Sequence, residues 1–349
     1  MSKGYFQRLY EQSPTRMWIN NPSGEDCDRA IAAGAINCTT NPQYCQKLMT
    51  SDPDYIRGVI DTVLLKETTD HEKAANRVYQ VVSRRVMEKF MPLYEKSGGK
   101  YGCVTMQDDP RKDEDTASVM EAVHRNRKLS PNYMVKIPVI DGGMQAIEQC
   151  VEENIPICAT EVFSIAQTID MCQMYEKAAE RSGNLPLFFV THITGIFDDY
   201  LQRFAKRTGV EIDPGVLSQA GCAVGRKEYR LIKERGYRTV MLGGGVRNLS
   251  HFTEFVGGDV HITINWKEVD ALIEQDGPVV SCIDAETPQA VIDELCDKFE
   301  AFRQAYHDDG LKREEYAGYG PVQLFRNAFL MGWYTLLAEI SKRRNALAL

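Results

Sequence analysis

The chain has 349 residues, of which 43% are hydrophobic and 26% are charged, a balance that is typical of folded globular proteins and excludes wholesale disorder, collagen and coiled coil. Its 49 acidic residues against 41 basic ones give a formal net charge of -8, so it would repel a nucleic-acid backbone on average and we expect no nucleic-acid partner. No stretch of 18 apolar residues predicts a membrane span, and the first residues lack the apolar core of a signal peptide, so we expect no membrane partner either.

Ten cysteines are scattered along the chain. None forms a CxxC pair and none has a histidine nearby that would complete a zinc site, so we expect reduced core thiols and no metal. Reduced thiols are typical of the cytoplasm, which is the compartment we predict.

Short apolar runs alternate with longer stretches of helical periodicity along the chain. This order is typical of parallel strands joined by helices, and eight such strands predict an α/β fold of the (β/α)8 TIM-barrel type. The predicted strands are Arg16–Ile19, Ala35–Cys38, Tyr101–Met106, Tyr133–Ile137, Ile157–Val162, Leu187–Thr191, Thr239–Leu242 and Val260–Ile264. Helices are predicted between them at Asp115–Asn126, Met144–Glu153, Ser164–Arg181, Asp198–Thr208 and Leu217–Arg235.

Two regions depart from the repeat. Gln43–Gly98 carries three successive helical patterns and predicts a helical insertion, about residues 43–98. The tail, about residues 288–349, carries apolar residues at helical spacing in Leu295–Tyr306 and Val322–Leu337, and we expect it to pack across the barrel. No linker separates these parts, so we predict one domain over residues 1–349.

Lys136 is a lysine in the middle of an apolar strand, where burying an ammonium group is costly. Burial in general lowers the pKa of a lysine, and a neutral amine can attack a carbonyl to form a Schiff base. The alternative is a lysine that extends from the strand end to solvent, and spacing alone does not decide between the two. The predicted barrel favours chemistry, because side chains at the carboxyl ends of its strands form the active site and Pro138 ends this strand.

Several segments carry further motifs in a fixed order. They are Cys38-Thr39-Thr40-Asn41-Pro42, Met134-Val-Lys136-Ile-Pro, Ala159-Thr160-Glu-Val-Phe-Ser164-Ile-Ala-Gln167, Asp213-Pro214-Gly215-Val216, Gly236-Tyr237-Arg-Thr-Val-Met-Leu-Gly-Gly-Gly-Val-Arg247-Asn248 and Gly258-Asp259-Val-His-Ile-Thr263-Ile264. In order and spacing they resemble the transaldolase family, class I aldolases that form a Schiff base on an α/β barrel. Each motif is weak alone, but the set is specific, and a lysine on the fourth strand separates this family from other lysine aldolases on barrels.

The resemblance implies roles for particular residues. Lys136 is the expected Schiff-base lysine, with Thr39 and Asn41 beside the substrate hydroxyls. Thr160 is expected to position a catalytic water, and Gln107 stands where the family carries a Glu or Gln that holds the same water. Without the resemblance, both threonines would be interpreted as ordinary strand formers.

Asn20 is the largest departure from the family pattern, because the family places an acid-base Asp at this position. In the family this aspartate takes the proton of the C4 hydroxyl as the C3–C4 bond breaks, which an amide cannot do. The expected cost is the 10²- to 10⁴-fold, roughly, of a lost general base. The other interpretation is that Asn20 keeps only a hydrogen bond.

The expected phosphate site is also altered. The family's phosphate-gripping arginine falls on Ile196, its water-holding aromatic residue falls on Ile193, and Thr191 replaces a serine or alanine. Arg247 remains beside a run of three glycines, where the Gly245 backbone can approach an anion. We expect Arg247 to bind an anion; the alternative is a surface salt bridge.

His192 and Glu161 are candidates for replacement acid-base chemistry. Strand alternation predicts that Glu161 faces the helices if Thr160 faces the interior. By the same argument His192 is a buried structural histidine. Asp198 is expected to cap the following helix.

These observations predict a transaldolase-like enzyme that forms a lysine Schiff base with a sugar or sugar phosphate, without a cofactor, and catalyses aldol cleavage or ketol-unit transfer. One alternative is retro-aldol cleavage and re-addition, which would make the enzyme a sugar C4 epimerase. Another is a non-catalytic sugar-phosphate-binding protein, in which Asn20 marks the lost acid. We expect a homo-oligomer, of a size that the sequence does not reveal.

Overall fold

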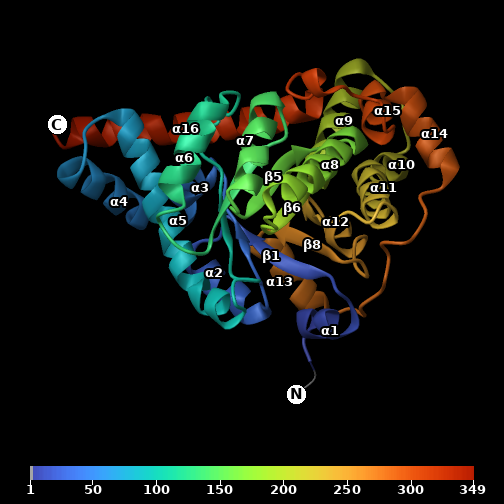
Figure 1. The fold of residues 1–349 in the computed structure, drawn as a ribbon, viewed down its shortest axis with the longest axis horizontal. Helices are drawn as coiled ribbons and strands as arrows, with labels where there is room; N and C mark the ends of the chain where they lie inside the picture. The colour runs from blue at the N-terminus through green and yellow to red at the C-terminus, as the bar shows by residue number, and fades with distance from the viewer. Residues whose placement is uncertain (1–2) are drawn as a thin grey trace. The chain divides into compact units, whose positions relative to one another are not determined.

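The computed structural model describes residues 3–349 and contains a closed barrel of eight parallel strands, β1 to β8, in sequence order (Figure 1). This confirms the predicted (β/α)8 fold. The strands are β1 (Arg16–Asn20), β2 (Cys38–Thr39), β3 (Val104–Met106), β4 (Tyr133–Pro138), β5 (Ile157–Val162), β6 (Phe188–Ile193), β7 (Val240–Gly244) and β8 (Val260–Ile264).

Helices follow or precede every strand. They are α1 (Tyr5–Gln12), α2 (Gly24–Ala33), α3 (Tyr44–Ser51), α4 (Pro53–Lys66), α5 (His71–Lys96), α6 (Thr116–Asn126), α7 (Asp141–Glu152), α8 (Ile165–Ser182), α9 (Thr194–Thr208), α10 (Pro214–Leu217), α11 (Ala220–Glu234), α12 (Ser250–Thr253), α13 (Trp266–Gln275), α14 (Gln289–Lys298), α15 (Glu300–Tyr306) and α16 (Gly320–Ala346), with a 3₁₀ turn at Arg313–Glu315. Within the described residues, no helix is both long and apolar enough to cross a membrane.

The chain divides into two compact units. The β5–β8 unit comprises Met1–Trp18 and Ile137–Phe325, and the β1–β4 unit comprises Ile19–Lys136 and Arg326–Leu349. Each unit thus joins segments that are far apart in the sequence. The single domain over residues 1–349 stays a prediction.

The β1–β4 unit contains the helical insertion at the predicted place, as α3, α4 and α5. Helix α5 begins where the Asp70 carboxylate accepts a hydrogen bond from the backbone N–H of Lys73 at 2.9 Å, which satisfies one of the free donors of its first turn. Helix α2 ends at Gly34, whose φ of 111° is a left-handed conformation that suits glycine. Local capping signals therefore set these boundaries.

In the β5–β8 unit two predicted boundaries are wrong. Helix α9 begins at Thr194, so Asp198 lies within it and does not cap it. The helix predicted over Leu217–Arg235 is α11, but it begins three residues later, at Ala220, after the short helix α10 has ended at Leu217. In the first turn of α11, the backbone N–H of Gly221 donates to the Asp198 carboxylate of α9 at 2.8 Å, an interaction between helices that no local pattern signals.

Strand β5 contains a β-bulge against β6. Ala159 pairs with Val190 and Val162 pairs with His192, so the two residues Thr160 and Glu161 lie opposite the single residue 191. Glu161 has a φ of 63°, in the left-handed region. The regular alternation that we assumed along β5 is therefore wrong at this point.

The tail forms three helices. In Figure 1, α14 and α15 lie beside α10 and α11, against which they pack. In α16, the ring of Phe325 lies edge-on to Phe163 just after β5, with ring centroids 6.3 Å apart. Phe329, one turn later, is fully buried.

Candidate active site

Lys136 is the fourth of the six residues of β4, and all six are buried. Its side chain is 6% exposed, and Nζ lies 5.2 Å from the centroid of the Phe329 ring. The Phe329 ring thus packs against the end of the lysine side chain. The lysine is thus inside the protein rather than extended to solvent, as the chemical interpretation requires.

Asn20 ends β1, and its Oδ1 accepts a hydrogen bond from the Thr39 hydroxyl of β2 at 3.0 Å. A second pair of residues links the same two strand ends. Asn21 Nδ2 donates to Asn41 Oδ1 at 3.0 Å, and the Asn41 backbone N–H donates to Asn21 Oδ1 at 3.2 Å. The structure therefore brings Asn20, Thr39 and Asn41 together at the ends of β1 and β2. Asn21 was missed by the sequence analysis, although its φ of 43° is one that asparagine tolerates well.

Gln107 follows β3 directly and is 2% exposed. Thr105, at the middle of β3, accepts the backbone N–H of Thr40 at 3.2 Å through its hydroxyl, which ties β3 to the segment after β2. Gln107 thus lies at the carboxyl end of a strand, as Lys136 does, within the β1–β4 unit.

In the β5–β8 unit, Thr160 and Thr191 are both buried within their strands. Thr191 Oγ1 lies 3.2 Å from Cys158 Sγ. The hydroxyl of Thr160 is buried and has no hydrogen-bond partner within residues 3–349. A buried hydroxyl in this state can accept or donate a bond to a water or a substrate hydroxyl.

Arg247 and Gly245 follow β7. Gly245 has a φ of 66°, and a Cβ there would lie 2.7 Å from Ile193 Cγ2 and 3.1 Å from Ile196 Cγ1. The two isoleucines therefore cover this glycine with apolar atoms. The Arg247 side chain is 45% exposed, and its Nε donates to Asp199 Oδ2 at 2.8 Å. The salt bridge that the sequence analysis gave as the alternative for Arg247 is therefore present. Anion binding by Arg247 stays a prediction.

A buried histidine holds the backbone of Arg247, and the sequence analysis missed it. His251 Nδ1 accepts the Arg247 backbone N–H at 3.1 Å. Because Nδ1 is an acceptor, Nε2 carries the hydrogen, and it donates a hydrogen bond to Asp198 Oδ2 at 2.9 Å. Burial raises the pKa of Asp198, although the hydrogen bond from His251 opposes that shift.

His192 is the buried structural histidine that the alternation predicts. It is fully buried, with Nδ1 3.1 Å from Glu228 Oε1 and Nε2 2.8 Å from the carbonyl oxygen of Gly221. Burial acts to lower the pKa of His192, but the Glu228 carboxylate raises it and the net shift is upward. His192 therefore serves to bind β6 to α11.

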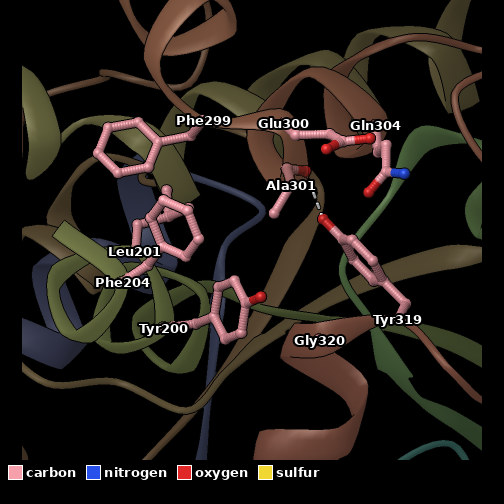
Figure 2. Close-up of a pocket in the computed structure, with 9 residues that line it drawn as sticks. All are labelled: Tyr200, Leu201, Phe204, Phe299, Glu300, Ala301, Gln304, Tyr319 and Gly320. Atoms are coloured by element: carbon pink, nitrogen blue, oxygen red, sulfur yellow. Dashed lines mark hydrogen bonds between the residues drawn. The ribbon is translucent and has the colours of Figure 1, made fainter. Parts of the chain in front are cut away.

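No group of three or more His, Cys, Asp or Glu side chains that could hold a metal ion occurs in the described part of the chain. A cavity of about 280 Å³ lies in the β5–β8 unit among α9, α15 and the start of α16. Figure 2 shows its aromatic walls, Tyr200, Phe204 and Phe299, and the Tyr319 hydroxyl, which donates to the Ala301 carbonyl at 2.5 Å. None of the candidate site residues lines this cavity.

Comparisons with known proteins agree with the resemblance seen in the motifs. The model of the transaldolase/fructose-6-phosphate aldolase family matches residues 17–317. The transaldolase of Mycobacterium ulcerans is 26% identical over 272 residues, covering 68% of this chain and 71% of that protein. The transaldolase of Mycobacterium tuberculosis is 26% identical over 296 residues, 74% of this chain and 78% of that protein. Transaldolase 1 of Streptomyces coelicolor is 25% identical over 268 residues, which cover 70% of this chain and 68% of that protein.

Proposed function

Since this chain belongs to the transaldolase/fructose-6-phosphate aldolase family, we propose that it is a transaldolase-like enzyme that forms a Schiff base between Lys136 and a ketose or ketose phosphate. The observation that supports this most is the burial of Lys136 within β4, where its side chain is 6% exposed. Lysines without a specific role are mostly found at the protein surface.

The proposed reaction is aldol cleavage or ketol-unit transfer. The Lys136 amine attacks the C2 carbonyl of the ketose and loses water, which leaves a protonated imine. A base then takes the proton of the C4 hydroxyl, the O–H electron pair becomes the second bond of the C4 carbonyl, and the C3–C4 bond breaks. The electron pair of that bond passes into the protonated imine to give an enamine, and the fragment that begins at C4 leaves as an aldehyde. By the family resemblance, Thr39 and Asn41 hold substrate hydroxyls, Gln107 and Thr160 hold a water, and Thr191, Gly245 and Arg247 bind the rest of the substrate.

Imine trapping tests this proposal. The protein is incubated with a panel of ketoses and ketose phosphates under borohydride, and the masses of the intact chain and of the Lys136 peptide are measured. We expect a covalent adduct on Lys136 with at least one ketose. No adduct with any member of the panel would contradict the proposal and favour the non-catalytic alternative.

The non-catalytic alternative has one observation in its favour, the hydrogen bond by which Asn20 accepts from Thr39. An amide in this place binds hydroxyl groups but takes up no proton. An epimerase would trap the same imine as an aldolase, so only analysis of the released products separates those two reactions.

We expect Asn20→Asp to increase cleavage of fructose 6-phosphate. The new carboxylate can accept the C4 hydroxyl proton if the remaining site keeps the family geometry. The gain should be about a few-fold, because Ile196 has removed one phosphate contact and a poorly held substrate reduces the benefit of a well-placed base. Aldehyde release in a coupled assay measures it, with Asn20→Ala as the control. No change with any ketose that Lys136 still traps would place the proton acceptor elsewhere.

We expect Arg247→Ala to raise KM for a phosphorylated ketose about 10-fold or more. Loss of a charge-assisted hydrogen bond costs about 1.5–3 kcal/mol, and the Asp199 carboxylate would then remain without its cation. Steady-state kinetics with a ketose and its phosphate measure the effect, and KM for the unphosphorylated sugar should stay unchanged. An unchanged KM for the phosphate would mean that the substrate carries no anion there.

All ten cysteines are free thiols, eight of them buried. A reducing compartment keeps such thiols intact. We therefore place the protein in the cytoplasm as part of this proposal, acting on a small sugar as a homo-oligomer.

A further inference from the structure

Lys136 has an aromatic neighbour that comes from the last helix of the chain. Phe329 lies on α16, and both residues belong to the β1–β4 unit, which joins Ile19–Lys136 with Arg326–Leu349. The Lys136 Nζ lies 5.2 Å from the centroid of the Phe329 ring. We infer that Phe329 is a specificity-determining residue, whose ring forms a wall beside the Schiff base and limits the size of the carbonyl substrate. This inference rests on the proposed function.

The distance between the amine and the ring limits what can lie between them. In a Schiff base the carbonyl carbon is bonded to Nζ of Lys136, and the two groups that it carries lie one bond further away. Non-bonded carbon atoms make contact at about 3.5–4.0 Å. Because the centroid of the Phe329 ring is 5.2 Å from Nζ, a group that extends from Nζ toward the ring meets it after about one bond length. A carbonyl substituent on this side must therefore be small.

The ring has little freedom to move aside. Phe329 is 0% exposed and Lys136 is 6% exposed. Protein interiors are packed as densely as organic crystals, so a fully buried ring has few other positions to occupy. The ring is therefore a fixed boundary beside the amine.

Arg326, about one turn before Phe329, holds α16 to the loop between β3 and α6. Its Nη2 donates to Asp113 Oδ1 at 2.5 Å and its Nε donates to Asp113 Oδ2 at 3.3 Å, a two-point contact that fixes direction as well as distance. Its Nη1 donates to the Glu114 carboxylate. The side chains of Arg326 and Asp113 are 12% and 6% exposed, so salt and water screen this pair little. Arg326 is thus a positioning residue for Phe329.

Two residues just after Phe329 fix α16 to other parts of the β1–β4 unit. A Cβ on Gly332 would lie 2.8 Å from Gln43 Cα, so the helix touches the backbone of the segment that follows β2. The Trp333 ring lies edge-on to that of Tyr79 in α5, with ring centroids 6.1 Å apart. Contacts before and after Phe329 therefore hold its ring in place.

Two hydroxyketones that differ by one methylene test the inference. Hydroxyacetone carries a methyl group on its carbonyl carbon, and 1-hydroxy-2-butanone carries an ethyl group. Each is incubated with the protein under borohydride, and the intact mass and the mass of the Lys136 peptide give the rate of adduct formation. One methylene in a closed apolar pocket changes selectivity by about 10- to 200-fold. We expect the wild type to favour hydroxyacetone by about 10-fold or more.

Phe329→Ala should react with the two ketones at rates within about threefold of each other, because removal of the ring leaves room for the ethyl group. Phe329→Leu keeps a buried apolar side chain that is smaller than the ring, and it serves if Phe329→Ala fails to fold. Its preference for hydroxyacetone should be weaker than that of the wild type. The melting temperature of each variant shows whether it is folded.

Leu336→Ala is the matched control for loss of packing. Leu336 is also fully buried on α16, and it lies seven residues after Phe329, about 10 Å further along the helix. Its truncation should lower the melting temperature and keep the wild-type ratio of the two rates. A residue that serves only the core thus changes stability, whereas Phe329 changes selectivity.

Arg326→Gln tests the positioning role, because it leaves the ring and its buried neighbours intact. It should weaken the preference for hydroxyacetone about threefold or more, and Arg326→Lys, which keeps the charge, should restore part of it. Arg343→Gln is the control, since Arg343 makes the same two-point contact with Asp61, at 2.7 and 2.6 Å, near the end of α16. It should keep the wild-type ratio. An unchanged ratio in Arg326→Gln would overturn the positioning role.

The outcomes separate the two proposals. A wild type that forms no adduct with either ketone or with any ketose overturns the proposed function and the role of Phe329 with it. A wild type that traps ketoses but reacts with the two hydroxyketones equally or not at all overturns the role of Phe329 alone. So does a folded Phe329→Ala with the wild-type ratio. An equal change of ratio in Leu336→Ala would also overturn it, because loose packing anywhere in α16 would then be sufficient.

Discussion

Lys136→Met should abolish both borohydride trapping and turnover while the protein stays folded. Methionine keeps an unbranched apolar side chain beside the Phe329 ring and removes the amine that attacks the carbonyl. Methionine also removes a buried polar group and so its desolvation cost. We therefore expect an unfolding free energy within about 1 kcal/mol of the wild type.

Intact mass after borohydride and a urea unfolding curve check this result. Lys128→Met is the matched control, since Lys128 is an exposed lysine in the turn before β4. It should trap and turn over as the wild type does. If Lys136→Met were trapped as fully as the wild type, the Schiff base would form on another lysine.

His251→Leu should destabilise the protein by about 1.5–3 kcal/mol, the cost of removing one of the two hydrogen bonds that the buried Asp198 carboxylate accepts. The side chains of His251 and Asp198 are 0% and 4% exposed, and the histidine is the donor to Asp198 Oδ2. His251→Gln keeps a donor for this oxygen and should cost less, about 1 kcal/mol or under. Urea unfolding of the two variants measures the difference. If both variants lose the same unfolding free energy, the hydrogen bond to the Asp198 carboxylate is not the stabilising contribution of His251.

The deficit of His251→Leu should also depend on pH. Burial already raises the pKa of Asp198 in the folded state, and removal of the hydrogen bond from His251 raises that pKa further. A group with a raised folded-state pKa favours the folded state at low pH and loses this contribution as pH rises through that pKa. The difference in unfolding free energy between the variant and the wild type should therefore grow from pH 5 to pH 8, and a constant difference would contradict it.

Local patterns predicted the strands well because each is a short apolar run with its own boundaries. Strand β5 was predicted to its exact ends, Ile157–Val162, and β8 to Val260–Ile264. Strand β2 moved from Ala35–Cys38 to Cys38–Thr39, since an edge between loop and strand depends on the neighbouring strand as well as on the sequence. Lys136 could be predicted as a site residue from local sequence too, because it is a charged residue inside an apolar run.

Contacts between distant residues could not be predicted in this way. His251 and Asp198 are 53 residues apart and Gly221 and Asp198 are 23 apart, and nothing in either segment signals the other. The bulge at Glu161 is a different case, because one additional residue shifts the face of its neighbour. Alternation assigned Glu161 to the helices, and the register with β6 shows that β5 does not alternate regularly at this residue.

The β1–β4 unit consists of two segments that are far apart in the sequence, and this affects when it can fold during synthesis. Its last segment, Arg326–Leu349, carries Phe329 and follows Lys136 only after the whole of residues 137–325 has been synthesised. Chains fold from the amino terminus as they leave the ribosome, so β4 must wait for the ring that covers its lysine. In a nascent chain that has not yet reached residue 326, Lys136 lacks the Phe329 ring as a neighbour.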